Sequence, residues 1–537
     1  MSPSPRFRTI GRAAPATKLL TGLAVATTAL LAFPALAGAQ DVDPAEAVAT
    51  LGKQTNLLWV VLGAVLVIFM QAGFALVETG FCRAKHASHV VSSNFAIFGL
   101  GFVAFYLVGY AFMFGGFSLP LVGFDTAPGG ALIGSGQWVF LWKGGFALTD
   151  MVGPGGAGAG ALGFFLYMVA FMDTTATIPT GAMAERWKWS AFVGWGLFCG
   201  AIYYPLFGAW TWGGGWLSQL GNSMHFGYGY VDFAGSGVVH AAGGVAGLAG
   251  AIVLGPRIGK FNADKSANTL PGHHLPMAML GTFILLFGWF GFNAASTFAA
   301  TDVQFAIVAA NTAIAAAFGA VAAMFWMMRM TGKPDPGMMV NGMLAGLVAI
   351  TAPCAFVDPW AAAVIGLIAG VLVILAAGFI ERRGVDDPVG AIAVHGVCGS
   401  FGVLAVGIFA NGTYGAGWNV TTEGKMFDSG KGVIGILGGD FSLGLSQLIA
   451  QAIGVVVLWT VIFGVAFAFF KIQNSVMKGG IRSLEADEIN GLDLPEMGAL
   501  AYPEFEFAIE HTDPEVGERA IIGSSRGSVH QGESPTT

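Results

Sequence analysis

The sequence contains eleven apolar segments that are each long enough to cross a lipid bilayer. A transmembrane helix needs roughly 17–25 predominantly apolar residues. The segments lie near 55–80, 94–117, 160–183, 190–212, 232–255, 275–298, 304–329, 338–357, 360–380, 389–411 and 445–471. Because backbone polar groups must be satisfied within the bilayer, the segments predict an all-α membrane protein with eleven transmembrane helices.

The composition agrees with a chain that is mostly embedded in lipid. Hydrophobic residues make up 55% of the chain and charged residues only 10%, which excludes a water-soluble globule of this size. The 82 glycines lie largely within the apolar segments, where small residues let membrane helices approach closely. The net charge of −7 leaves no basic surface and argues against nucleic acid as a partner.

The two ends of the chain differ from the apolar middle. Residues 1–39 predict a cleaved bacterial signal peptide, because a basic start precedes an apolar run and small residues around Ala37. An uncleaved anchor is the alternative. Residues 40–472 form the predicted eleven-helix domain, and residues 473–537, which are polar and acidic, form a predicted cytoplasmic regulatory tail.

Charge asymmetry predicts the orientation in the membrane. An odd number of spans places the two ends of the mature chain on opposite sides. Sixteen of the 24 Lys and Arg residues then lie on the side of the tail, against four on the other side and four in the signal peptide. The positive-inside rule therefore predicts a bacterial cytoplasmic (inner) membrane protein with its mature N-terminus outside and its C-terminus in the cytoplasm.

Two spans share a motif. Asp232, Gly235, Val239, His240 and Gly244 in the fifth span match Asp387, Gly390, Val394, His395 and Gly399 in the tenth at the same offsets. Helices five spans apart cross the membrane in opposite directions, so the match predicts a five-plus-five inverted repeat with an additional eleventh helix.

The repeat brings two histidines to the same depth. Each histidine follows its aspartate by eight residues, so helices that enter from opposite faces place both imidazoles near the midplane. These are the only two of nine histidines inside the predicted spans. Intramembrane polar groups usually mark a pathway, which favours a functional pair, and a structural hydrogen bond between helices is the alternative.

Further motifs in order along the chain resemble the ammonium transporter (Amt/Rh) family of bacterial Amt type, over about 56–498. The matching strings are 181–186 (Gly-Ala-Met-Ala-Glu-Arg), 212–215 (Trp-Gly-Gly-Gly), the two Asp-to-His motifs, 288–293 (Gly-Trp-Phe-Gly-Phe-Asn) with Ser296, 394–399 (Val-His-Gly-Val-Cys-Gly) and the tail segment 482–498.

The resemblance implies a role for each matching residue. Trp212, Ser296, Tyr167 and Phe171 would recruit ammonium in an outer vestibule, Phe171 and Phe292 would form a gate, and His240 and His395 would line the pore. Asp232 and Trp289 would organise the site, and Gly491, Leu492 and Asp493 would couple the tail to the pore. An aromatic face with a hydroxyl suits a small cation, and an apolar gate favours neutral ammonia.

Two acids inside the spans depart from an apolar pattern. Asp173 lies about 200° around its helix from Phe171 and therefore faces away from the pore if Phe171 faces it. We expect Asp173 to be a partnered structural acid between helices or protomers, and we expect the same of Glu78.

Three classes of function remain open at this stage. Transport of ammonium or ammonia is favoured, and the sequence leaves open whether charge moves and whether methylammonium is accepted. An ammonium sensor with the same fold is the alternative. A membrane redox enzyme with His240 and His395 as haem ligands is the third class, which the vestibule and gate motifs oppose; no cofactor and no metal are expected. The resemblance also implies a homotrimer and a PII-type regulatory partner.

Overall fold

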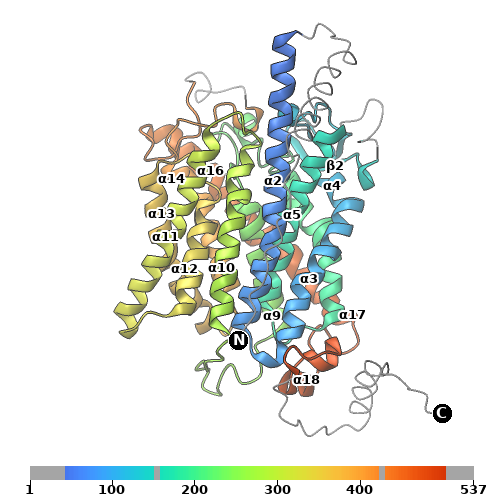
Figure 1. Cartoon of the computed structure of the whole chain (residues 1–537), viewed down its shortest axis with the longest axis vertical. Coiled ribbons are helices and arrows are strands. Elements are labelled where there is room, and N and C mark those ends of the chain that lie inside the picture. The colour runs from blue at the N-terminus through green and yellow to red at the C-terminus, as the bar shows by residue number, and fades with distance from the viewer. Residues whose placement is uncertain (1–42, 150, 152–157, 422–429, 504–537) are drawn as a thin grey trace, which may run out of the picture. The chain divides into compact units, whose positions relative to one another are not determined.

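The computed structural model describes residues 43–149, 151, 158–421 and 430–503. The predicted signal peptide and the last part of the tail lie outside the described residues. The described residues from Lys53 onward form one compact unit. Its helices run side by side as a bundle, with the strand β2 at one end and the helix α18 at the other (Figure 1). We call these the hairpin end and the tail end.

Eleven helical spans form the bundle in the described part of the chain, ten of 18 residues or more and one shorter. They are α2 (Pro44–Phe81), the span Ala84–Phe114 with α3 (Ala87–Ala104) and α4 (Tyr110–Phe114), α5 (Gly158–Ala182), Trp189–Trp210 with α6 (Trp189–Phe198) and α7 (Tyr204–Trp210), Ser236–Leu254 with α9 (Ala242–Leu254), Leu275–Thr297 with α10 (Leu275–Trp289), α11 (Gln304–Thr331), the shorter α12 (Pro336–Ile350), α13 (Pro359–Arg382), Ile392–Phe409 with α14 (Cys398–Phe409), and Phe441–Val476 with α16 (Phe441–Val457) and α17 (Phe463–Val476). The predicted all-α membrane fold is confirmed.

Local sequence explains where several of these helices begin and how closely they pack. Asp335 accepts a hydrogen bond from the Met338 backbone at 3.0 Å and so caps α12, and proline follows the cap directly. At Gly319 of α11, a Cβ atom would lie 2.3 Å from the Gly342 carbonyl of α12. The glycines of the apolar segments therefore allow backbone contact between helices, as expected.

Several boundaries differ from the predictions. The second span begins at Ala84 rather than near residue 94, because the polar stretch that contains His86 and His89 is already helical. The statement that only two histidines lie inside spans is therefore wrong. The first span begins at Pro44, about a dozen residues before the predicted start, and the last begins at Phe441.

A β-hairpin lies between the second and third spans and was not predicted. Strands β1 (Gly130–Ser135) and β2 (Trp138–Lys143) pair antiparallel, with Gly130 opposite Lys143 and Ser135 opposite Trp138. The loop is apolar but has no local pattern that indicates two paired strands. Its apolar side chains pack against the hairpin end of the bundle, which is tertiary information. One further short helix, α18 (Glu485–Asn490), lies in the tail.

Candidate functional site

The two repeated motifs have the same local structure. The carboxylate of Asp232 accepts backbone hydrogen bonds from Gly235, Gly237 and Val238 at 2.8–2.9 Å. The carboxylate of Asp387 accepts backbone hydrogen bonds from the equivalent turn, at 2.9 Å and 2.7 Å. Both aspartates therefore accept hydrogen bonds from amides at the start of a helix, which is a capping role.

A glycine at the same position of each motif makes this turn possible. Gly235 has φ +114° and Gly390 has φ +80°, values that favour glycine. The helices begin only after these glycines, at Ser236 and near Ile392. Both motifs therefore form the same turn before the helix that carries the histidine.

The two histidines meet in the middle of the bundle. The Nδ1 atoms of His240 and His395 lie 3.2 Å apart, and the ring centroids are 5.2 Å apart. One imidazole must donate and the other accept, so this hydrogen bond requires at least one neutral ring and fixes the tautomers. The Nε2 atom of His240 is buried and has no hydrogen-bond partner among the described residues, so it is available to a small molecule.

Trp289 fixes the orientation of the His240 ring. The two rings stack at a centroid distance of 5.1 Å and an interplanar angle of 19°. The indole nitrogen of Trp289 donates a hydrogen bond to the Thr351 hydroxyl at 2.9 Å. An anchored indole that covers one face of the imidazole restricts its rotation, which is the geometry a site-organising residue requires.

Two phenylalanines stack next to the histidine pair. The rings of Phe171 from α5 and Phe292 from the π-helical turn Phe290–Ala294 lie 4.0 Å apart at 25°. The Phe292 ring is also 5.3 Å from the His240 ring. On its other side Phe171 contacts Trp212 edge to face at 5.8 Å. A continuous row of rings therefore leads from Trp212 to the histidines.

A cavity of about 630 Å³ lies at the hairpin end of this row. Its lining includes all four residues expected to recruit the substrate, Tyr167, Phe171, Trp212 and Ser296, together with Trp418 and Asp232. The Trp212 indole nitrogen donates a hydrogen bond to the Asp232 carbonyl at 2.7 Å, which fixes the indole at the cavity wall.

The Tyr167 hydroxyl points into the protein rather than standing free in this cavity. It lies 2.9 Å from the Gly291 carbonyl, 3.1 Å from the Phe292 carbonyl and 3.0 Å from the Ser296 hydroxyl. Tyr167 therefore contributes its ring face to the cavity and ties α5 to the turn that carries Phe292. Aromatic faces beside a serine hydroxyl form a surface that suits a small cation.

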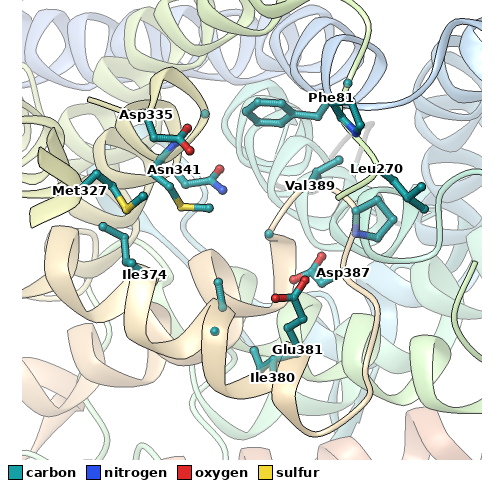
Figure 2. A pocket seen from close by; sticks show the side chains of 18 of the residues that line it. Phe81, Leu270, Met327, Asp335, Asn341, Ile374, Ile380, Glu381, Asp387 and Val389 are labelled. Atoms are coloured by element: carbon teal, nitrogen blue, oxygen red, sulfur yellow. The ribbon is translucent and has the colours of Figure 1, made fainter. Parts of the chain in front are cut away.

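A second cavity, of about 580 Å³, opens at the tail end. Figure 2 shows this cavity with the carboxylates of Asp335, Glu381 and Asp387 around it. A small cavity of about 20 Å³ lies between it and the histidine pair and is lined by His395, Phe74 and Glu78. Asn341 and Val389 line both of these cavities, so the two adjoin. The histidine pair therefore lies between a cavity at each end of the bundle.

The sequence did not indicate that Glu78 and Asn341 line the small cavity beneath the histidine pair. Glu78 is hydrogen-bonded between helices, as expected of a structural acid, but it also lines the cavity beneath His395. Its charge in an apolar span was the available signal. Asn341 carried no comparable signal, because its spacing alone does not indicate which face of α12 it occupies.

Asp173 has the structural environment that was expected of it. The side-chain amide of Gln71 in α2 donates a hydrogen bond to its carboxylate, so Asp173 links α5 to α2. Asp173 lines none of the three cavities described above.

The tail segment folds back against the tail end of the bundle. The Leu492 amide donates to Nδ1 of His86 at 3.2 Å, and the Asp493 carboxylate accepts from the His89 amide at 2.9 Å. Leu492 is fully buried, and burial raises the pKa of Asp493. The predicted coupling residues therefore contact the second span directly.

A buried ion network supports the same end of the bundle. Arg257 bonds the Asp386 carboxylate at 2.9 Å and the Glu185 carboxylate at 3.1 Å. Glu185 in turn pairs with Arg83. Burial alone would raise the pKa of Asp386, but the charge of Arg186 and the hydrogen bonds from Arg257 lower it to about 2.

The geometry of the two histidines argues against a haem between them. Two metal–nitrogen bonds of about 2 Å each would require nitrogens about 4 Å apart, with the iron between them. The observed Nδ1 atoms are 3.2 Å apart and hydrogen-bonded to each other. Among the residues that the structure describes, no group of three or more His, Cys, Asp or Glu side chains could hold a metal ion.

The chain is similar to proteins of one family. A family model described as the Ammonium Transporter Family matches residues 58–502. Ammonium transporter Amt2 of Archaeoglobus fulgidus is 42% identical, over 90% of this chain and 96% of that protein. Ammonium transporter Amt1 of Haloferax mediterranei is 35% identical, over 87% of this chain and 82% of its own length.

Solved structures agree with the sequence comparisons. A structure described as a Sensor Amt Protein superimposes with a TM-score of 0.70 at 36% identity, covering 83% of this chain and 99% of that one. Candida albicans Mep2 superimposes with a TM-score of 0.66 at 25% identity, covering 85% of this chain and 93% of that one.

Proposed function

Because the chain belongs to the ammonium transporter family, we propose that it transports ammonium along the path between the two cavities. The observation that carries this proposal is the order of groups along one line. Trp212 contacts Phe171, Phe171 stacks on Phe292, and Phe292 contacts His240. A cation-binding surface, an apolar barrier and a polar pair therefore follow each other.

Ammonium is recruited in the cavity of the hairpin end. Its lining combines the Trp212 and Tyr167 rings with the Ser296 hydroxyl oxygen. Asp232 also lines the cavity. Cation–π attraction reaches about 2 kcal/mol when water is removed, and a hydroxyl oxygen accepts a hydrogen bond from ammonium. Because the rings are fixed by the Trp212 and Tyr167 hydrogen bonds, little reorganisation accompanies binding.

The stacked phenylalanines act as a gate that selects for neutral ammonia. Dehydrating a charge in a low-dielectric gap costs several kcal/mol or more, whereas ammonia carries no net charge. Beyond Phe292, the free Nε2 atom of His240 is a hydrogen-bonding partner for ammonia. The imidazole pair also provides a route by which a proton can cross.

We also propose an orientation of the chain in the membrane and an oligomeric state. The hairpin end faces outside and the tail end faces the cytoplasm of a bacterial cell, following the positive-inside rule. Residues 1–39 are a signal peptide that is removed, and residues 473–537 regulate the pore. Three copies assemble as a homotrimer, and a PII-type protein reads the tail end. The sensor alternative is not favoured, since the curated relatives are named ammonium transporters.

Growth on limiting ammonium tests the proposal in cells that lack their own ammonium transporters. The full chain should restore growth, and Trp212→Leu should raise the ammonium concentration needed for half-maximal uptake by roughly tenfold, the equivalent of one lost cation–π contact. Trp360→Leu is the matched control, because Trp360 is an exposed tryptophan of α13 that lines none of the three cavities. Failure of the full chain to restore uptake, with the protein present in the membrane, would contradict the proposal.

A further inference from the structure

Glu78 is a buried carboxyl group on the tail side of the histidine pair. It lies in α2, is 3% exposed, and lines the cavity of about 20 Å³ together with His395. A cavity of this volume accommodates one water molecule, provided that several polar groups surround it. Glu78, His395 and Asn341 all line the cavity and supply those groups. One water is therefore enough to connect the imidazole with the carboxyl group.

The partners of Glu78 are neutral. Asn94 of α3 donates to one carboxylate oxygen at 2.7 Å, and the Thr180 hydroxyl of α5 lies 3.0 Å and 2.8 Å from the two oxygens. None of the ion pairs among the described residues includes Glu78. No cation in this part of the chain therefore holds the Glu78 carboxyl group in its ionised form.

Thr180 can support both protonation states of Glu78. Its hydroxyl oxygen is within hydrogen-bond reach of the Glu78 carboxylate and of the Thr177 carbonyl. When Glu78 is ionised, the Thr180 hydroxyl donates to it. When Glu78 is protonated, its own O–H donates to the Thr180 oxygen, and the Thr180 hydroxyl turns to the Thr177 carbonyl. The switch needs only the rotation of one hydroxyl.

The second partner is fixed and does not need to move. The side-chain nitrogen of Asn94 donates to Glu78 and to the Val90 carbonyl, while its oxygen accepts from the Thr177 hydroxyl at 2.9 Å. These three bonds set the orientation of the amide, so Asn94 always offers a donor to the same oxygen of Glu78. The other oxygen of Glu78, whose neighbour is the rotatable Thr180 hydroxyl, is the one that can gain or lose a proton.

We propose that Glu78 is the residue that accepts a proton from the histidine pair and returns it to ammonia at the tail end. This inference rests on the proposed transport function. At the hairpin end an N–H bond of ammonium breaks and an N–H bond forms on the histidine pair, which leaves neutral ammonia. In the first step at Glu78, an N–H bond of the protonated pair breaks and an O–H bond forms on the Glu78 carboxylate, through one water. In the second step the Glu78 O–H bond breaks, an N–H bond forms on ammonia, and ammonium leaves. Glu78 is again a carboxylate, and one positive charge has crossed.

The tail-end cavity provides the exit for that ammonium. Asn341 and Val389 separate the small cavity from the larger one, whose wall carries the carboxylates of Asp335, Glu381 and Asp387 (Figure 2). Lys260 and Arg382 also line this cavity, and Lys260 pairs with Glu381. Asp335 and Asp387 belong to no ion pair among the described residues, and their negative charge stabilises a cation over a neutral molecule. Ammonia that has passed the histidines therefore reaches Glu78 first and gains its charge where the surroundings favour it.

Glu78→Gln is the direct test, in proteoliposomes that contain the purified full-length protein as the only membrane protein. Glutamine keeps the size and an acceptor oxygen but cannot take up a proton. We expect ammonium-driven current to fall by about 100-fold, the lower end of a general acid–base contribution. Glu78→Asp should restore part of the current because it restores an ionisable group.

Asp173→Asn is the matched control. Asp173 is also a buried acid bonded by a neutral amide, but it lines none of the three cavities. Its variant should retain the current. Elution volume and thermal unfolding in detergent are recorded for all variants, and infrared difference spectra of the wild type with and without ammonium should show a protonated carboxyl band that Glu78→Gln removes.

The outcomes separate this inference from the transport proposal. Wild-type currents in a folded Glu78→Gln variant would overturn the role of Glu78 and leave transport intact. Ammonia flux without any current in the wild type would also overturn it, because no proton would then cross. If Glu78→Gln does not fold, the infrared band of the wild type decides, and a band that persists unchanged in Glu78→Asp contradicts the assignment. Absence of both flux and current in the wild type is instead a failure of transport itself.

Discussion

A carboxylate at the position of His240 should change which cations enter the pore. His240 contacts Phe292 and His395, so the side chain of His240→Asp would lie beside the stacked phenylalanines. An ionised carboxylate stabilises a cation about 4 Å away by several kcal/mol at an effective dielectric near 20. We therefore expect potassium to leak and ammonium selectivity to fall.

Potassium flux into proteoliposomes at several pH values checks this expectation. Desolvation can keep the new carboxyl group protonated, in which case the leak grows as pH rises. His240→Asn is the neutral control and should not leak. Full ammonium selectivity of His240→Asp at every pH would show that selectivity is set at Trp212 and the phenylalanines instead.

The buried ion network makes a separate prediction about stability. Asp386→Asn leaves Arg257 without one of its carboxylates, and loss of one partner of a buried pair costs about 3–5 kcal/mol. We expect the thermal midpoint in detergent to fall clearly. Asp125→Asn, which breaks the exposed pair with Lys53, should change it little. Equal effects of the two substitutions would contradict the role of burial.

The same residue sets a pH dependence. The folded-state pKa of Asp386, about 2, lies below its ordinary value of 3.8, so the folded protein binds the proton less readily than the unfolded chain. Its contribution to stability is therefore complete above an ordinary carboxyl pKa and is lost as pH falls towards 2. Unfolding followed between pH 6 and about pH 3 should show a smaller acid loss for Asp386→Asn than for the wild type. Parallel curves would contradict this assignment.

At the scale of elements, docking of the tail depends on one glycine. Gly491 has φ +119°, and a Cβ atom there would lie 2.4 Å from the Lys85 carbonyl. Gly491→Ala combines backbone strain of about 1–3 kcal/mol with a steric clash. We expect faster amide hydrogen exchange over α18 and residues 493–497, together with altered transport.

Gly498→Ala is the control for this change. Gly498 also has a positive φ, +68°, but nothing lies within 4 Å of its Cβ position. Its variant should therefore show strain without loss of docking. Deletion of residues 479–537 should reproduce the Gly491→Ala effect on transport without preventing insertion into the membrane. Unchanged transport in both would leave the tail without a coupling role.

The elements that could be predicted from the sequence are those whose signal is local. Apolar length alone predicts the spans, and the repeat of Asp, Gly and His predicts that the two histidines lie at the same depth. Their direct contact is a finding of the structure. The hairpin β1–β2 could not be predicted, since its apolar residues are ordered only by contact with the bundle. The early start of the second span was missed because its first turns carry the polar residues His86 and His89. The tail bonds the His86 ring and the His89 backbone amide, and such tertiary contacts leave no pattern in the sequence.

The candidate site shows the same limit. The resemblance to the ammonium transporter family implied that Trp212, Phe171, Phe292 and His240 act together, and the structure brings them into one row. The sequence could not indicate that Glu78 faces the cavity below His395, because the neighbour that each face of α2 meets depends on how the helices pack. The positions of single polar side chains are therefore tertiary information.

For the whole molecule, cysteine labelling tests the orientation. All four native cysteines lie in the described part of the chain and are buried, so background labelling should be low. Thr126 at the hairpin end and Ala263 at the tail end are exposed and therefore suit a labelling experiment. An impermeant thiol reagent should label Thr126→Cys but not Ala263→Cys in intact cells. The reverse pattern would invert the topology.

The central claim is that ammonium crosses this chain along the path of Trp212, the stacked phenylalanines and the histidine pair. Current and internal pH recorded together, after an ammonium pulse onto proteoliposomes with the purified protein, test it most directly. We expect an ammonium-dependent signal that an equal potassium pulse does not produce and that Trp212→Leu shifts to higher ammonium concentration. No current and no pH change beyond those of protein-free liposomes, at any ammonium concentration, would contradict the claim.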